Sequence, residues 1–342
     1  MNKIKFIFKR ILDMDFKAVF KTVSRMHKRS GKNSIVLFFD VIWCGFKYGA
    51  GYRDYEYFEF YTLNAEQRAT YLVRTVNNLI TAHCNQKDHY HWLHDKVDFN
   101  KRYNDYVKRD WIDFRSASKE DFMRFIDGKK AIIVKPVDAT CGEGIKKFNV
   151  ADYETYDALY DELKASKGID LIEDYIVQHS ELSRLYPYSV NTCRVTTLLI
   201  GEEVHIIATA LRIGNNASVV DNISSGGMSA PINIQTGAVI LAAYDKSGNE
   251  FKEHPMTGES IKGFVIPYWD EIVKMCKAAA LVTPEVRYSG WDVAVAEDGP
   301  QLIEGNHLPG YSVIQTPPSH QEVKTYGLLP MMRELLKDEF KI

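Results

Sequence analysis

The N-terminal part of the chain has the apolar spacing of α-helices. Apolar residues recur at three- and four-residue steps from Ile4 to Met26, with Lys and Arg between them, which predicts an amphipathic helix. Two interpretations stay open: the helix packs on the body of the protein with its basic face solvated, or it lies on an anionic membrane or a partner. A further helix is predicted over 65–80, with Asn64 as its N-cap.

The longest apolar run extends from Ile35 to Phe46 and contains Asp40. A membrane-spanning helix needs roughly 20 apolar residues, and this run is shorter. We therefore predict a buried helix or strand here rather than a transmembrane segment. As a whole, residues 1–115 are predicted to be mostly helical, and they are rich in Tyr, Phe and Trp.

The pattern changes near residue 116, where short β-branched runs begin to alternate with helical segments. Helices are predicted over 118–126, 153–165 and 267–282. The first of them begins with a capping-box pattern of Ser118 and Asp121. Strands are predicted over 131–134, 171–177, 194–200, 204–211, 293–296 and 301–304. The pattern therefore indicates an α+β fold that follows a helical N-terminal region, with a boundary near 116.

Composition adds an asymmetry of charge to this picture. The 342 residues are 45% hydrophobic and 26% charged, which excludes wholesale disorder, a collagen-like fibre and a polytopic membrane protein. The formal net charge of −2 combines +8 over residues 1–33, the leader, with −10 over the remainder. Such asymmetry is typical of a membrane or nucleic-acid contact. The length allows about two domains.

Cysteine usage and the N-terminus both bear on the compartment. The number of cysteines is odd, their spacing is irregular and no CxxC occurs, so we expect neither a disulfide framework nor a zinc site built on cysteine. Charged residues interrupt any apolar core of a signal peptide within the leader. These features predict a cytoplasmic protein. The cysteines are Cys44, Cys84, Cys141, Cys193 and Cys276.

A candidate metal site lies on the last predicted hairpin. With a three-residue loop over 297–299, residue i pairs with residue 596 − i, so Asp292 falls opposite Glu304 and Asn306 shares their face. A two-residue loop would place Asp292 on the other face, but Gly299 suits the left-handed position of a three-residue loop. The two carboxylates and the amide oxygen of Asp292, Glu304 and Asn306 are ligands that suit Mg²⁺. The alternative is an acidic hairpin with solvated carboxylates.

Three further candidates concern a nucleotide and its phosphates. Lys135 ends a strand before a loop with Gly142 and Gly144, where backbone N–H groups can approach a phosphate; the alternative is an ordinary turn. Glu173, at a strand end, can accept a hydrogen bond from a purine amino group; the alternative is a solvated edge. Arg194 and Arg212 can project toward one anion; the alternative is a pair of surface arginines.

In this order the candidates resemble the ATP-grasp superfamily, and most closely its sugar-transfer-associated branch, which is predicted to act in cell-surface polysaccharide synthesis. The resemblance spans roughly 95–315. It implies an ATP-grasp fold in which two α+β subdomains, 116–186 and 187–340, clasp the nucleotide after the helical region 1–115. The segments that carry it are 134–136, 189–195, 210–214, 219–222, 226–227, 266–271, 290–294 and 302–306.

The resemblance implies a role for each candidate residue. Lys135 binds the nucleotide phosphates, and a loop over 138–144 closes on them. The residues of this loop that contact the nucleotide are Thr140, Gly142, Glu143 and Gly144. Adenine is read by the Glu173 side chain and by the backbone of Tyr175 and Ile176, with Gln178 or Glu181 near the ribose. Catalysis falls to Arg194 and Arg212, which hold the γ-phosphate or an acyl phosphate, and one or two Mg²⁺ ions bind Asp292, Glu304 and Asn306.

The implied activity is an ATP- and Mg²⁺-dependent, ADP-forming carboxylate–amine ligase that works through an acyl phosphate. The alternatives are a phosphotransferase with a hydroxyl acceptor and a non-catalytic nucleotide-binding scaffold. The expected partners are ATP and small-molecule or glycan-precursor carboxylates and amines, without nucleic acid. We also expect peripheral contact with the inner membrane face through residues 1–33. Residues 1–115 lack the strand–helix alternation of the domain that usually begins such enzymes, so no acceptor pocket is predicted.

Overall fold

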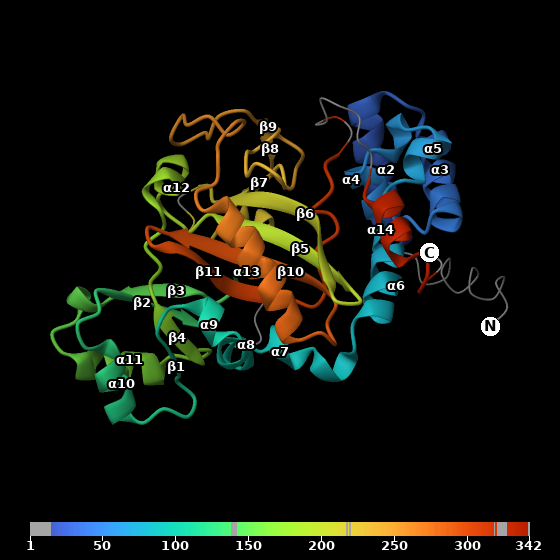
Figure 1. Cartoon of the computed structure of the whole chain (residues 1–342). Helices are drawn as coiled ribbons and strands as arrows, with labels where there is room; N and C mark the ends of the chain where they lie inside the picture. Colours follow the sequence, from blue (N-terminus) through green and yellow to red (C-terminus); the bar gives the residue numbers. More distant parts are fainter. Residues whose placement is uncertain are drawn as a thin grey trace. The chain divides into compact units, whose positions relative to one another are not determined.

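The computed structural model describes residues 15–137, 142–216, 218, 220–317, 319 and 327–340 (Figure 1). The chain divides into two compact units: Met1–His83 with Gly310–Ile342, here the helical unit, and Cys84–Pro309, here the sheet unit. The boundaries predicted at residues 116 and 187 rest on changes in the secondary-structure pattern, whereas these two units are defined by compactness. The predicted boundaries therefore remain a prediction.

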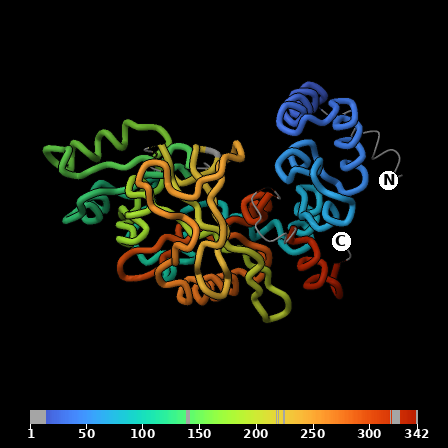
Figure 2. The backbone as a smooth tube through the Cα atoms, turned by 90° about the horizontal axis from the view of Figure 1, so that it is seen from above, coloured from blue at the N-terminus to red at the C-terminus, as the bar shows by residue number. Residues whose placement is uncertain are grey.

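The helical unit combines both ends of the described chain. Figure 2 shows α14 beside the N-terminal helices, and the Leu329 N–H donates to the Thr70 carbonyl at 2.9 Å. Its apolar core includes Val23, Val41, Tyr55 and Phe58. Its helices are α2 (Phe16–Ser30), α3 (Ser34–Lys47), α4 (Tyr52–Tyr57), η1 (Phe60–Thr62), α5 (Ala65–Arg68), α6 (Arg74–Cys84) and α14 (Leu329–Leu336).

The leader helix is confirmed over α2, and its first part lies outside the described residues. The Asp15 side chain caps α2 by accepting from the Ala18 N–H, and Gly31 ends it in a left-handed conformation. Val19, Val23 and Met26 bury the apolar stripe of α2 in the helical unit. Over Phe16–Ser30, therefore, the helix packs on its own unit through its apolar stripe, as the first interpretation expects, while Lys17, Lys21 and Lys28 stay exposed.

The run from Ile35 to Phe46 forms α3, and the expectation that it is buried is only half right. Leu37, Val41 and Cys44 face the core, whereas the opposite face of α3 is exposed. Apolar residues on every side of a helix normally indicate burial all round, but no described residue covers the outer side of α3. No helix in the described part of the chain has the length and apolar character to cross a membrane.

The predicted helix over 65–80 is two helices. Asn64 caps the first in a capping box with Gln67, as expected, but α5 ends at Arg68 and α6 begins at Arg74. Between them, the Leu72 N–H donates to the Gln315 side chain and the Leu72 carbonyl accepts from it, both at 2.8 Å. A glutamine distant in sequence thus satisfies the backbone groups that a continuous helix would pair internally.

The smaller sheet of the sheet unit has four antiparallel strands in the order β1-β4-β2-β3. The helices α10 (Lys119–Ile126) and α11 (Tyr156–Ala165) share its apolar core (Figure 1). Ser118 and Asp121 form the capping box that the sequence predicts for α10. The strands are β1 (Trp111–Asp113), β2 (Ala131–Lys135), β3 (Lys146–Asn149) and β4 (Leu171–Asp174).

The larger sheet has seven strands in the order β11-β10-β5-β6-β7-β8-β9, and α13 (Trp269–Val282) packs against it (Figure 1). The α+β class is confirmed. The strands are β5 (Thr192–Ile200), β6 (Glu203–Ile213), β7 (Met228–Pro231), β8 (Ala243–Tyr244), β9 (Glu250–Phe251), β10 (Tyr288–Ala296) and β11 (Gly299–Asn306). The remaining short helices are η2 (Lys87–His89), α7 (His91–His94), α8 (Lys96–Arg102), α9 (Asn104–Val107), η3 (Val150–Asp152), α12 (Ser180–Leu185) and η4 (Ile223–Ser225).

The hairpin of β10 and β11 reaches the predicted register by a different route. Ala296 pairs with Gly299, so the loop has two residues rather than the three expected. The register then shifts at a bulge, because Val293 pairs with Leu302 while Asp292 pairs with Glu304. Asp292 therefore lies opposite Glu304, as expected, although the premise about the loop is wrong.

Candidate active site

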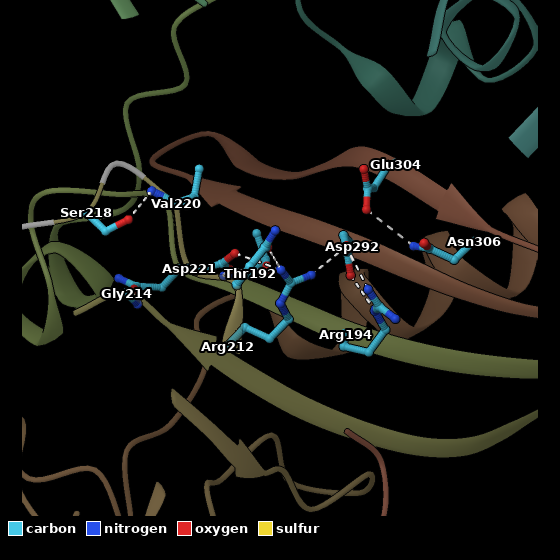
Figure 3. Close-up of polar contacts among 12 residues, drawn as sticks. Thr192, Arg194, Arg212, Gly214, Ser218, Val220, Asp221, Asp292, Glu304 and Asn306 are labelled. Atoms are coloured by element: carbon cyan, nitrogen blue, oxygen red, sulfur yellow. Dashed lines mark hydrogen bonds and ion pairs between the residues drawn. The ribbon is translucent and has the colours of Figure 1, made fainter. Parts of the chain in front are cut away.

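A row of charged side chains crosses four neighbouring strands of the larger sheet (Figure 3). Glu304 on β11 pairs with Asp292 on β10, and Asp292 pairs with Arg194 on β5. Arg212 on β6 pairs with Thr192, two residues before Arg194, and therefore shares the face of Arg194. The register of the sheet thus gathers four residues that are scattered over the sequence.

The two arginines converge on one anion, which is the Asp292 carboxylate. Arg194 binds it through Nε and through Nη2, the latter at 2.9 Å, and Arg212 Nη1 lies 2.7 Å from Oδ2. All three side chains are buried. A buried charge is tolerated when it is paired and hydrogen-bonded, and this cluster meets that condition.

Arg212 has a second acidic partner in the loop after β6. Its Nη2 lies 3.0 Å from Asp221 Oδ1, and it also contacts the Asn222 side chain. The Thr192 N–H donates to Asp221 Oδ2 at 2.9 Å, which fixes that carboxylate. Burial lowers the pKa of Arg212, but Asp221 and Asp292 together raise it above its ordinary value. In the sequence, Asp221 stands out only as part of the segment 219–222 that carries the resemblance, and its contact with Arg212 was not predicted.

The two carboxylates of the row have opposite pKa shifts. Burial raises the pKa of Asp292, but the charges of Arg194 and Arg212 outweigh it and hold that pKa well below its usual range. Burial raises the pKa of Glu304, and the negative charge of Asp292 raises it further. This is the behaviour of two acids close enough to repel each other when both are ionised.

The donor set of this row fits a magnesium ion. Asp292 and Glu304 lie opposite each other in the strand register, and Asn306 Nδ2 lies 3.5 Å from Glu304 Oε1. Two carboxylates and an amide oxygen are hard ligands, and a divalent cation would relieve the repulsion that raises the pKa of Glu304. Among the described residues, no group of three or more His, Cys, Asp or Glu is arranged for a metal, so Asn306 would be needed as a third donor.

A second charged row crosses the smaller sheet. Glu173 on β4 contacts Lys135 Nζ on β2, and its Oε1 accepts from Arg109 Nη2 and Asn100 Nδ2, both at 2.7 Å. Burial raises the pKa of Glu173, but Arg109 and Lys135 outweigh it and lower that pKa to about 2. Both carboxylate oxygens are therefore held by side chains of the protein itself.

Sequence reasoning missed Arg109 and Asn100. Arg109 lies two residues before Trp111, which pairs with Glu173 across β1 and β4, so period-two alternation places Arg109 on the Glu173 face. Arg109 Nη1 also donates to the Leu302 carbonyl on β11 at 2.6 Å, which ties the two sheets together. No motif marks Arg109; only the pairing of β1 with β4, separated by 58 positions, makes it a neighbour of Glu173.

The predicted nucleotide contacts after β4 fall into two groups. No hydrogen bond involves the Ile176 backbone within the described residues, and the Tyr175 N–H makes only a 3.4 Å bond to Ala131. The Gln178 amide, in contrast, makes four hydrogen bonds, which are all that it can make. A ribose contact by Gln178 would therefore have to break one of them. Its partners are the Tyr186 and Ser189 carbonyls and the backbone and side-chain N–H groups of Asn191.

The glycine loop is described from Gly142 onward, and the predicted contact of Thr140 falls, with Cys141, outside the described residues. Gly142 and Gly144 have φ of 76° and 74°, the left-handed region that favours glycine. A Cβ on Gly142 would lie 3.0 Å from Asn222 Nδ2, so this loop adjoins the residue that contacts Arg212. Glu143 is exposed.

Known proteins offer two kinds of similarity. The family described as sugar-transfer associated ATP-grasp matches residues 76–323. Similar structures include D-alanyl-alanine synthetase A from Vibrio cholerae O1 biovar eltor (12% identity, TM-score 0.43, 72% of this chain and 64% of that one). Another is the ATP-grasp ligase PsnB with precursor peptide PsnA2 and AMPPNP (15% identity, TM-score 0.42, 77% of this chain and 68% of that one). A third is D-alanine-D-alanine ligase from Coxiella burnetii (12% identity, TM-score 0.40, 72% of this chain and 57% of that one).

The chain thus spans 64% of the length of the Vibrio cholerae synthetase. No curated protein matches the sequence. The family match covers well over half of the chain, and it includes both charged rows and the glycine loop. The chain therefore belongs to the sugar-transfer associated ATP-grasp family.

Proposed function

We propose that the protein is an ATP- and Mg²⁺-dependent, ADP-forming carboxylate–amine ligase in cell-surface polysaccharide biosynthesis. Family membership supports ATP binding and an ATP-dependent ligase class. The observation that carries the proposal is the convergence of Arg194 and Arg212, both buried, beside the acid pair Asp292 and Glu304. Positive and negative groups in this arrangement suit a phosphoryl transfer between two anions.

The proposed reaction has two steps. A substrate carboxylate oxygen attacks the γ-phosphorus of ATP, so that an acyl phosphate forms and ADP leaves. An amine then attacks the acyl carbon, phosphate leaves, and the amine loses a proton to the medium. Binding both substrates in line supplies much of the rate in such a reaction.

Nucleotide binding is assigned to the smaller sheet and the segments beside it. Lys135 would bind the phosphates, held in place by Glu173, while Gly142 and Gly144 shape the loop over them. Adenine would be read by the backbone of Tyr175 and Ile176 rather than by the Glu173 carboxylate, because protein donors already hold both its oxygens.

Phosphoryl transfer is assigned to the row on the larger sheet. Asp292, Glu304 and Asn306 would hold Mg²⁺, which neutralises phosphate charge when bound. Arg212 would turn Nη1 from Asp292 toward a phosphoryl oxygen. Because its Nη2 would stay paired with Asp221, the charge of the guanidinium would remain compensated. Arg194 gives a two-point contact of the kind that phosphate also accepts.

The test is ADP release with ATP, Mg²⁺ and a fractionated small-molecule cell extract, followed by the product's mass. We expect a product that joins two organic substrates, and release at least about 100-fold slower for Arg212→Gln. One phosphorylated organic substrate would instead assign a phosphotransferase. Binding of AMPPNP without any product across the fractions would assign a scaffold.

We further propose that the protein acts in the cytoplasm at the inner face of the membrane, with the leader as its basic contact. Residues 1–33 carry a net charge of +8, and Lys17, Lys21 and Lys28 on α2 are exposed. Anionic lipid attracts such segments. Sedimentation of the full-length protein with anionic vesicles tests this location separately from the reaction.

A further inference from the structure

The outward face of α3 is apolar along the whole helix. Ile35, Val36, Phe39 and Trp43 expose 67%, 62%, 64% and 57% of their surface, and Phe46 exposes 42%. Steps of three, four and seven residues place these side chains on one side of an α-helix. Leu37, Val41 and Cys44 bury the opposite side, so the outward residues are not part of the core.

This face continues onto α2. Phe20, which is 58% exposed, stacks on Phe38 with ring centroids 5.1 Å apart, and Phe38 meets Phe39 edge to face at 5.5 Å. Phe16 is exposed one turn before Phe20. A continuous apolar surface of this kind is unusual on a soluble protein and marks a contact site. We call it the α2–α3 apolar face, made of Phe16, Phe20, Ile35, Val36, Phe39, Trp43 and Phe46.

The charge around the face is strongly positive. Residues 15–47 hold seven Lys or Arg and two Asp, a net of +5, and one of these cations, Arg25, is paired with Glu56 on α4. Asp40, on α3, is neutralised by Arg68, whose two Nη atoms lie 2.8 and 2.7 Å from its oxygens. Lys17 and Lys21 directly follow Phe16 and Phe20 and are exposed, as is Lys47 at the end of α3.

This positive charge bears on what covers the face, a second copy of the chain or an anionic surface. Two copies would bring +5 against +5, which opposes self-association, whereas an anionic surface is attracted. At about 1.5 Å per residue the 14-residue α3 is about 21 Å long, too short to span a bilayer but suited to lie in its interface. Aromatic side chains beside lysines are typical of interfacial helices.

We propose that the α2–α3 apolar face inserts into the interface of an anionic phospholipid bilayer, with α3 lying in the membrane plane. The proposal shares the membrane location proposed for the leader, and it adds residues 34–47, which the leader does not include. It does not depend on the proposed reaction, because vesicle binding and ADP release are separate measurements.

The test is co-sedimentation of the full-length protein with phosphatidylcholine vesicles that do or do not contain phosphatidylglycerol. We expect binding to the anionic vesicles only, and at least about tenfold weaker partitioning for the double variant Phe39→Ser, Trp43→Ser. Leu79→Ser with Leu281→Ser is the matched control, because these leucines are 52% and 51% exposed elsewhere. It should bind like the unmodified protein. Circular dichroism confirms that each variant folds.

Three results would overturn the proposal. One is equal sedimentation of the unmodified protein and the Phe39→Ser, Trp43→Ser variant. Another is equal binding to neutral and anionic vesicles. The third is a dimer in light scattering that becomes a monomer in the double variant, without vesicle binding by either; the face would then be covered by a second copy.

Discussion

Lys135 on β2 and Glu173 on β4 form a buried ion pair across neighbouring strands of the four-stranded sheet. Because Glu173 pairs with Ile133 in the strand register, Lys135 is its diagonal neighbour on the same face. Arg109 reaches the same carboxylate from β1. The lysine that the sequence singles out for phosphate is thus held by an acid that is itself doubly paired.

Removing the Glu173 charge should damage both the fold and nucleotide binding. Breaking a buried ion pair from one side costs about 3–5 kcal/mol, so Glu173→Gln should lower the free energy of unfolding by that order. Without its partner, Lys135 loses its fixed position, and AMPPNP should bind at least about tenfold more weakly. Urea unfolding and calorimetric titration measure the two effects. The control Glu143→Gln alters an exposed acid and should leave stability unchanged.

The same carboxyl group should make stability depend on pH. Its folded-state pKa is lowered from 4.5 to about 2, so its contribution is complete above about 4.5 and is lost as pH falls toward 2. A shift of this size corresponds to about 3 kcal/mol. The stability difference between the unmodified protein and Glu173→Gln should therefore shrink as pH falls from 7 to 3. A difference that stays constant over this range would contradict the assignment.

Asp292 and Glu304 should respond differently to loss of charge. Asp292→Asn leaves Arg194 and Arg212 without their shared anion and should lower stability by about 3–5 kcal/mol. Glu304→Gln removes an acid whose pKa is already raised, so its cost in unfolding free energy should stay below about 1 kcal/mol. Both variants should slow Mg²⁺-dependent ADP release at least about 100-fold. If Glu304→Gln releases ADP at the normal rate, Glu304 does not hold the metal.

Gln178 should prove to be a structural residue. Gln178→Ala leaves the Ser189 carbonyl and the Asn191 backbone N–H without partners, at a cost of about 2–4 kcal/mol. The Tyr186 carbonyl keeps its bond from the Asn191 side chain. AMPPNP affinity in the folded variant should change less than about threefold. A large loss of affinity with little loss of stability would instead restore the predicted ribose contact. Glu181→Ala tests the other residue predicted near the ribose.

Local patterns predicted most elements but not their surroundings. Capping at Asn64 and Ser118 appears as expected because it depends only on side chains within three residues. The helix after Asn64 breaks because Gln315, far along the chain, binds Leu72. Likewise, the apolar run over 35–46 predicted a helix or strand, yet burial depends on what packs against it, and the outer face of α3 has no cover in the described structure.

The candidate site divides along the same line. The residue types and the order of Lys135, Arg194, Asp292 and Glu304 were enough to indicate a family and its chemistry, because type and order can be read without knowing which strands are neighbours. The contact of Arg109 with Glu173 could not be predicted, because β1 and β4 become neighbours only in the folded sheet. The sequence also pointed to Arg194 and Arg212 as partners of one anion, but only the folded sheet supplies Asp292 as that anion.

The hairpin of β10 and β11 shows the division most clearly. By itself the sequence determined that two acids and an amide lie on the arms of one hairpin, since alternation along each strand is local. A two-residue loop alone would have turned Asp292 and Glu304 to opposite faces. The bulge between the pairs of Val293 and Asp292 restores them to one face. Whether a strand absorbs an extra residue depends on its partners across the sheet, so the tertiary structure decided that these acids meet.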